Sequence, residues 1–254
     1  AGDQQAATIG QHCLELGDTK ATFGTGAFVL TNMGSKLPRS SHRLLGTVLC
    51  QENGQRTYAL EGSIFVAGSL IKWLRDELGV IRKASESEEL ARAVPDNGGV
   101  LFVPALAGLG APHWKPDATG VMAGLTQGTS RAHIVRAAME SLAHQCHDLQ
   151  DAFAADGAAW KTLRIDGGMS ANNWIAQDLA DILALPVERA ADTETTALGA
   201  AMLASVGVGI HGSLKDAMCM GSQRQSFTSS MGAAPRQGRI QLWQEGLRRH
   251  IECG

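Results

Sequence analysis

Several short segments carry residue types that suit chemistry on a phosphoryl group. The first is Gly2-Asp3-Gln4-Gln5, in which a carboxylate precedes two side-chain amides. A carboxylate in a cleft accepts the proton of an attacking hydroxyl, and neighbouring amides orient that hydroxyl by hydrogen bonds. Taken alone, four polar residues at a chain end are far more often a solvated terminus.

The second segment is Phe23-Gly24-Thr25-Gly26, in which a hydroxyl stands between two glycines. Glycine lets backbone N–H groups approach phosphate oxygens closely, and the threonine hydroxyl adds a donor. The segment lacks the spacing and the lysine of a Walker-type loop. Without further context, a plain hairpin turn is the more common meaning of such a pattern.

The third segment covers residues 165–173, IDGGMSANN, where a strand leads through two glycines into a helix. The free N–H groups at such a helix start attract a nucleotide, and Asn172 and Asn173 in the first turn offer hydrogen bonds to it. A strand-to-helix connection capped by Ser170 explains the same residues equally well.

Two further patterns lie on expected helices. Gly68 and Lys72 are four residues apart on a helix over 64–78, hence on one face, and a mid-helix glycine suggests that something large packs there. Glu140, His144 and Asp148 also share a face, which permits a metal site. Acid and imidazole at this spacing are more often solvated surface, so we assign no metal ligand.

The elements that must position these residues follow from apolar periodicity and turn signals, which predict β-hairpins followed by a βαβα pattern. We expect hairpins around Gly24–Gly26 and around Asn53-Gly54, strands over 100–106, 162–166 and 187–190, helices over 64–78, 133–153, 171–184 and 196–206, a surface connection over 222–236, and a last amphipathic helix around 240–251. The fold class is therefore α/β.

Composition excludes several kinds of partner. The 254 residues are 44% hydrophobic and carry a formal net charge of -3, so the basic excess of a nucleic-acid or membrane-surface binder is missing. Apolar stretches fall short of the roughly 20 residues that span a bilayer. Five cysteines without a CxxC pair argue against a disulfide framework. We expect a cytoplasmic protein with a small-molecule substrate.

Taken in order, the segments resemble the C-terminal domain of the FGGY carbohydrate kinases, and within them the members that phosphorylate glycerol. The resemblance extends from residue 2 to about residue 210 and fades beyond. The carrying segments are GDQQAA at 2–7, FGTGAF at 23–28, YALEGSIFVAG at 58–68, WLRDE at 73–77, GLGAPHWKPDATG at 108–120, GVMAGLTQGTSRAHIVRAAMESLA at 120–143, IDGGMSANN at 165–173 and TALGAA at 196–201.

The resemblance implies an actin/hexokinase-like (ribonuclease H-like) ATPase domain with helices on both faces of its sheet. It implies that residues 1–254 are the C-terminal nucleotide-binding domain, with a core of about 1–210 and an extension with a helix at about 211–254. The N-terminal substrate domain would be absent from this chain, which begins inside what reads as an active-site loop. ATP or ADP with Mg²⁺ is the implied ligand.

Roles carry over from the family position by position. Asp3 is expected to be the catalytic base, and both Asp3 and Gln4 are expected to bind the substrate. The nucleotide-contact positions are Gly24, Thr25, Gly68, Lys72, Gly168 and Asn172. One of these departs from the family, which has glutamine four residues after the glycine where this chain has Lys72. That lysine adds a positive charge whose effect the sequence leaves open.

The implied activity of the intact protein is transfer of the ATP γ-phosphate to a primary hydroxyl of glycerol, with this half alone inactive. Two alternatives stay open: an FGGY kinase for another polyol or sugar, such as xylulose or gluconate, and a non-catalytic nucleotide-binding module. The sequence also leaves the oligomeric state open, a homo-oligomer included.

Overall fold

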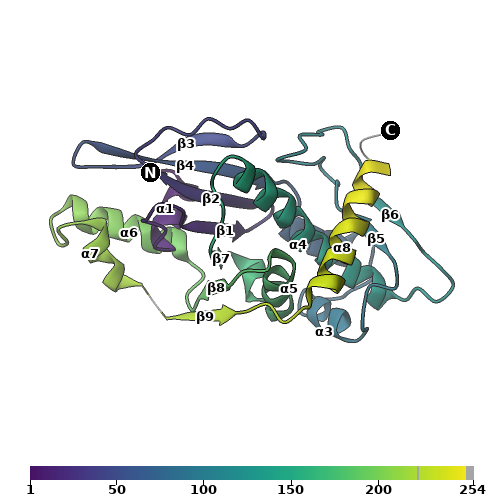
Figure 1. Cartoon of the computed structure of the whole chain (residues 1–254). Coiled ribbons are helices and arrows are strands. Elements are labelled where there is room, and N and C mark those ends of the chain that lie inside the picture. Colours follow the sequence, from purple (N-terminus) through teal and green to yellow (C-terminus); the bar gives the residue numbers. More distant parts are fainter. Residues whose placement is uncertain (222, 250–254) are drawn as a thin grey trace.

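The computed structural model describes residues 1–221 and 223–249, and its centre is a seven-stranded mixed sheet (Figure 1). The strand order is β3-β4-β2-β1-β7-β8-β9. β1, β7 and β8 run parallel, and the remaining neighbours pair antiparallel. The bounds are β1 Thr19–Phe23, β2 Ala27–Gly34, β3 Leu45–Glu52, β4 Gln55–Ile64, β7 Leu163–Asp166, β8 Val187–Ala190 and β9 Arg224–Phe227.

Both predicted hairpins are present, and their turns differ in backbone conformation. Asn53 and Gly54, between β3 and β4, have φ of 49° and 81°, the left-handed pair that a two-residue hairpin turn requires. The turn from Gly24 to Gly26 joins β1 to β2. The sheet therefore begins as the sequence predicts.

Helices cover both faces of the sheet, which confirms the α/β expectation. α1 (Asp3–Gly10) and α6 (Thr195–Gly207) pack together on one face, and α4 (Arg131–Ala155) and α5 (Asn173–Leu183) lie on the other (Figure 1). The main core lies between the sheet and the second pair of helices. It includes five fully buried side chains: Phe23, Leu142, Phe153, Ile165 and Leu179.

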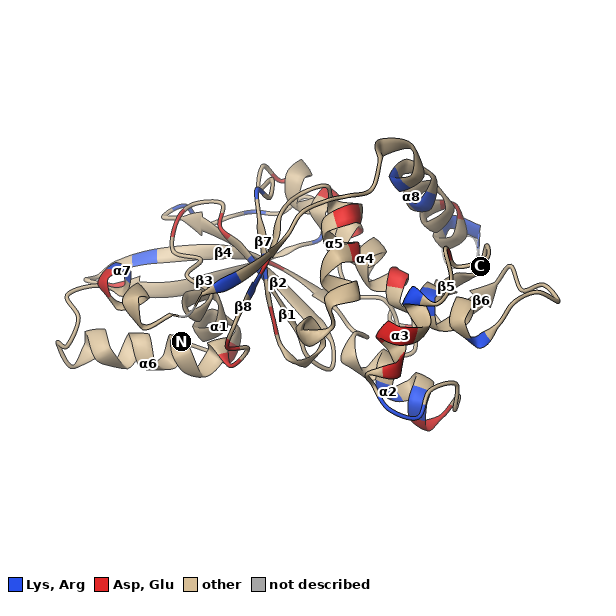
Figure 2. Cartoon of the chain, turned by 90° about the horizontal axis from the view of Figure 1, so that it is seen from below, with Lys and Arg blue, Asp and Glu red and all other residues tan. Residues whose placement is uncertain are grey.

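A smaller layer is built at the end of the molecule opposite α6 and α7 (Figure 2). It contains α2 (Gly68–Asp76), α3 (Glu86–Arg92), a two-stranded sheet of β5 (Leu101–Val103) and β6 (Val121–Ala123), and α8 (Ala233–Leu247). The remaining elements are η1 (Gly168–Ala171), α7 (Leu214–Ala217) and η2 (Met218–Met220). Among the described helices, none is both long and apolar enough to cross a bilayer.

Four expected elements were wrong in extent or kind. The helix over 64–78 begins only at Gly68, because β4 continues to Ile64 and pairs there with Ala27. The N-terminal segment is the helix α1 rather than a loop. The surface connection over 222–236 contains β9, which pairs with β8 at the edge of the main sheet. The last helix begins earlier, at Ala233, and residues 250–251 of its expected end lie outside the described residues.

Candidate functional site

A cavity of about 790 Å³ opens at the carboxyl ends of the parallel strands β1 and β7. Its walls come from the turn after β1, from α2, from residues 84–88, and from η1 with the start of α5. Such strand ends are the usual ligand position in α/β sheets. All six nucleotide positions predicted from the sequence line this one cavity: Gly24, Thr25, Gly68, Lys72, Gly168 and Asn172.

The turn after β1 and the start of α2 are joined by backbone hydrogen bonds. The Gly68 N–H donates to the Gly24 carbonyl at 2.8 Å, and the Ser69 N–H and hydroxyl donate to the Thr25 carbonyl at 3.1 and 2.9 Å. A Cβ on Gly68 would lie 2.4 Å from the Gly24 carbonyl oxygen. Gly68 is therefore the first residue of α2, not a mid-helix glycine, and what packs against it is the backbone of the turn.

The segment after β7 contains two glycines with different roles. Gly167 has φ of 83°, and a Cβ there would lie 2.4 Å from the Phe23 carbonyl oxygen. Its lack of a side chain therefore lets the end of β7 pack directly against the backbone at the end of β1. Gly168 is exposed, and a Cβ there would meet nothing within 4 Å. Because Gly168 lines the cavity, its missing side chain leaves space for a ligand against the backbone.

Asn172 is the N-cap of α5. Its Oδ1 accepts hydrogen bonds from the N–H groups of Trp174 and Ile175 at 2.9 and 3.1 Å, which leaves the amide Nδ2 as a donor. Ser170 does not cap the helix as one interpretation held, because its hydroxyl donates back to the Gly167 carbonyl at 2.7 Å.

One wall of the cavity was missing from the sequence prediction. Ser87 and Glu88 of α3 line it, the Asn172 amide donates to the Ser87 hydroxyl at 3.4 Å, and Glu88 accepts from the Asn173 N–H at 3.2 Å. The run SESEELAR at 85–92 carried a usable signal, because serine followed by acidic residues is typical of a helix start.

Two cationic side chains lie on the α2 side. Arg75 forms a two-point contact with Asp76, at 2.6 and 2.9 Å, and this hydrogen bonding holds the pKa of the Asp76 carboxyl below its usual value. Lys72 is exposed and makes no hydrogen bond or ion pair with any described residue. Lys72 therefore leaves a positive charge available at the cavity.

Asp3 and Gln4 do not line the cavity. They form the start of α1, where Asp3 is exposed and its Oδ1 accepts the Gln4 N–H at 2.8 Å. The Gln4 Oε1 accepts a hydrogen bond from Lys20 of β1 at 2.6 Å. β1 leads directly into the Gly24-Thr25 turn, so the strand that contacts Gln4 ends at the cavity.

Residues 19–208 match the family model described as the FGGY family of carbohydrate kinases, C-terminal domain. The chain belongs to the FGGY family of carbohydrate kinases. A glycerol kinase of Rhodospirillum centenum is 49% identical over 248 residues, and one of Gluconobacter oxydans is 50% identical over 252. The alignments cover 98% and 99% of this chain but 50% and 49% of the relatives, so the chain spans about half their length.

Solved structures agree with this assignment. A Plasmodium falciparum glycerol kinase crystallised with ADP superposes with a TM-score of 0.90 at 37% identity, covering 98% of this chain and 50% of that one. A xylulose kinase of Lactobacillus acidophilus matches with a TM-score of 0.82 at 20% identity, covering 96% and 49%. The second likeness supports the fold alone. Together they confirm the expected actin/hexokinase-like domain.

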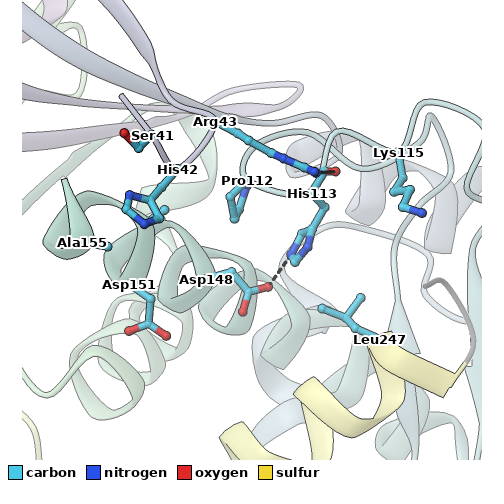
Figure 3. A pocket seen from close by; sticks show the side chains of 11 residues that line it. Ser41, His42, Arg43, Pro112, His113, Lys115, Asp148, Asp151, Ala155 and Leu247 are labelled. Carbon is cyan, nitrogen blue, oxygen red and sulfur yellow. Dashed lines mark hydrogen bonds and ion pairs between the residues drawn. The ribbon is translucent and has the colours of Figure 1, made fainter. Parts of the chain in front are cut away.

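A second cavity, of about 620 Å³, lies on another part of this FGGY domain (Figure 3). His113 points toward Asp148 of α4, with 2.9 Å between Nε2 and Oδ2, and the Trp243 indole donates to the same oxygen at 2.9 Å. At the rim, His42 contacts Asp156 at 2.7 Å. Burial raises the pKa of Asp156, but hydrogen bonds from Ser40, His42 and Ser41 outweigh it and lower the pKa overall.

The stripe of Glu140, His144 and Asp148 in this FGGY domain is buried, so its interpretation as solvated surface was wrong. α8 packs over it: His144 stacks on Trp243 with 5.4 Å between ring centroids. Glu140 accepts from Arg136 at 2.9 Å and from Asn97 at 2.8 Å. Within residues 1–221 and 223–249, no group of three or more His, Cys, Asp or Glu could hold a metal ion.

Proposed function

We propose that this chain is the nucleotide-binding half of an ATP-dependent glycerol kinase, whose intact form transfers the γ-phosphate of ATP to a primary hydroxyl of glycerol. The product would be glycerol 3-phosphate. Relatives at about half identity over nearly the whole chain carry the name glycerol kinase, and they are twice as long. The proposal therefore includes a substrate domain of comparable size that belongs to the same protein.

The observation that carries the proposal is the convergence of six positions on one cavity. They come from three segments far apart in the sequence, the β1 turn, α2 and the β7–α5 connection. Backbone at Gly24 and Gly168 is exposed there, and Lys72 and the Asn172 amide add donors. Exposed glycine backbone, a cation and amide donors are the groups that hold nucleotide phosphates in proteins. The related Plasmodium falciparum structure contains ADP.

Asp3 is proposed as the general base. A glycerol hydroxyl oxygen forms a bond to the γ-phosphorus as the bond to the β–γ bridging oxygen breaks, ADP leaves, and the hydroxyl proton passes to the Asp3 carboxylate. A base of this kind contributes about 10²- to 10⁴-fold, and positioning supplies much of the rest. The exposed carboxylate of Asp3 at the first residue of α1 suits this role.

Mg²⁺ is proposed to arrive with the nucleotide. When bound, it would neutralise the negative charge that develops on the phosphate oxygens during transfer. The described residues offer no ready-made metal cluster of their own, and Glu88 is the carboxylate that lines the cavity. The described cysteines, which are free, fit a reducing compartment such as the cytoplasm.

ADP binding by this chain is the first test. Isothermal titration with ADP and Mg²⁺ should show one site per chain, because all six nucleotide positions are present. A folded chain that does not bind ADP would contradict the proposal.

Turnover of the intact protein is the second test. Asp3→Asn should lower glycerol phosphorylation by about 10²- to 10⁴-fold while ADP affinity stays the same, because the amide cannot take the proton. Asp151→Asn is a matched control, since Asp151 is an exposed carboxylate of α4 whose one ion pair among the described residues is with His147, at 3.5 Å. Normal turnover in Asp3→Asn would remove Asp3 from the role.

Xylulose and gluconate kinases share the fold at 20–21% identity, so fold alone does not select the substrate. A panel of glycerol, xylulose and gluconate with the intact protein separates these alternatives. Efficient phosphorylation of glycerol alone is the expected result. ADP binding without turnover on any of them would instead favour a non-catalytic nucleotide-binding module.

A further inference from the structure

Lys20 is a fully buried lysine that forms no ion pair with any residue in the described part of the chain. It lies in the middle of β1 and has no exposed surface. Its Nζ donates to Gln4 Oε1 at 2.6 Å and to Thr22 Oγ1 at 2.8 Å, and both acceptors are neutral. Burying an ammonium group is costly unless it is compensated, so the residue calls for an explanation beyond packing.

Three carboxylates surround this ammonium without a direct contact. Asp3 comes from α1, Glu61 from β4 and Asp166 from β7, and each attracts the Lys20 charge electrostatically. Asp166 is also buried: one oxygen accepts the Thr195 hydroxyl, and the other has no hydrogen-bond partner within the described residues. Burial still dominates, because it lowers the pKa of Lys20 to about 8 against the attraction of Asp166, Cys13, Glu61 and Asp3.

Arg164 provides a matched comparison on the neighbouring strand. It is paired with Lys20 in the β1–β7 register and faces the same helix, α1. Arg164 contacts the segment that follows α1, donating to the His12 carbonyl at 2.9 Å, and lies 3.3 Å from Asp18 and 3.6 Å from Glu188. Arg164 is thus held by ion pairs with carboxylates, whereas Lys20 donates to the side-chain amide of Gln4 in the first turn of α1.

An ammonium group determines which way that amide points. Lysine has three donors and no acceptor, so only the oxygen of the Gln4 amide can face Nζ. The Nε2 end of Gln4 must then point away, and it makes no hydrogen bond with any described residue. Without the lysine, the two orientations of the amide would differ little in energy.

We propose that Lys20 is a positioning residue for the polyol subsite: it fixes the Gln4 amide with Nε2 outward, so that Gln4 donates to a substrate hydroxyl beside the Asp3 base. This inference rests on the proposed function, because it assumes that Gln4 contacts the polyol. With Gln4 held as a hydrogen-bond donor, Asp3 is the acceptor of the two residues. Gln4 then donates to the oxygen of a substrate hydroxyl, and Asp3 accepts a hydroxyl proton.

The pH dependence follows from the groups that face Lys20: Asp3, Glu61 and Asp166, with Cys13 beyond α1. With a pKa of about 8, Lys20 loses its proton as the pH rises through that value. A neutral amine accepts as well as donates, so the amide is then free to turn. KM for the polyol should rise above about pH 8 in the wild-type protein, and this rise should be absent in Gln4→Ala.

The decisive experiment is a double-mutant cycle in the intact protein. Lys20→Met should raise KM for glycerol about tenfold, with a smaller change in kcat and unchanged ADP affinity. In the Gln4→Ala background, Lys20→Met should add nothing, because the residue acts through that amide. Arg164→Met is the control: it should lower Tm without changing KM.

An unchanged KM in Lys20→Met, or equal effects of Lys20→Met with and without Gln4, would overturn the inference. If Lys20→Met does not fold, Lys20→Gln takes its place in the cycle with the same expected rise in KM, because its amide accepts as well as donates and so no longer dictates which end of the Gln4 amide faces it. A wild-type protein without glycerol turnover would count against the proposed function instead. In that case the Gln4 side-chain ¹⁵NH₂ resonances still test the contact, because they should shift in Lys20→Met and not in Arg164→Met.

Discussion

The two hairpin turns of the main sheet look alike in sequence and differ sharply in their surroundings. Asn53-Gly54 is the stronger turn signal of the two, yet a Cβ on Gly54 would meet nothing within 4 Å. At the other turn, a Cβ on Gly26 would lie 2.5 Å from the Ile64 carbonyl oxygen, and Gly68 and Gly167 pack their backbones against the same turn. The Gly24–Gly26 turn is enclosed by other backbone segments, whereas the Asn53-Gly54 turn projects into solvent.

Glycine is therefore present at these turns for two separate reasons. At Gly54 the backbone conformation alone requires it, because φ is 81°. Around Gly24-Thr25 the glycines let backbone segments approach one another, and Gly24, Thr25 and Gly68 of this closely packed region line the 790 Å³ cavity. A turn becomes a candidate ligand site when other segments pack against it and leave its backbone exposed to a cavity.

The largest effect is expected at Gly167, where both reasons apply. Gly167→Ala combines a φ of 83° with a Cβ 2.4 Å from the Phe23 carbonyl oxygen, so it should lower the free energy of unfolding by about 3 kcal/mol. Urea denaturation of the chain measures this loss. If Gly167→Ala lowers the free energy of unfolding no more than Gly54→Ala does, the close packing around the β1 turn does not contribute to stability, and the two turns do not differ in the way described.

A second variant separates the cavity from the packing beneath it. Gly168→Val should reduce ADP affinity about 100-fold, because filling a built site costs about 1–3 kcal/mol and each 1.4 kcal/mol is about tenfold. Stability should change little, since a Cβ at Gly168 meets nothing within 4 Å. Titration with ADP and urea denaturation measure the two quantities. Gly207→Val is the control, because its Cβ is equally unobstructed but lies at the end of α6; a matching loss of affinity there would contradict the assignment of the cavity.

Much of the fold was predictable because its signals are local. An apolar stripe predicts α4 and an alanine-rich run predicts α6, each within a few residues, and the glycine and Asn-Gly turns predict both hairpins. β9 was missed because RQSF has no alternating pattern and owes its strand form to pairing with β8. The start of α2 was misplaced because Ile64 and Val66 fit a helical stripe as well as a strand.

The candidate site likewise contains residues that local motifs predict and residues that depend on tertiary packing. The six positions predicted to bind nucleotide follow from short motifs taken in order along the chain, and the structure brings all six to one cavity. The wall formed by Ser87 and Glu88 depends on α3 packing beside α5, which no local pattern states. The buried lysine beneath Gln4 was likewise invisible, because Lys20 reads as a polar strand residue until α1 covers it.

The smallest effect is expected at the open turn. Gly54→Ala should cost about 1 kcal/mol of unfolding free energy, because a left-handed conformation is disfavoured for alanine and nothing else opposes the new methyl group. ADP affinity should not change, since the β3–β4 turn is not part of the cavity lining. Urea denaturation and ADP titration of Gly54→Ala and Gly167→Ala measure both effects side by side. Gly54→Ala adds backbone strain alone, whereas Gly167→Ala adds the same strain together with a steric clash. A loss of ADP affinity in Gly54→Ala would mean that strain at either hairpin of the sheet reaches the cavity. The segments that pack around each turn would then not explain which turn affects ligand binding.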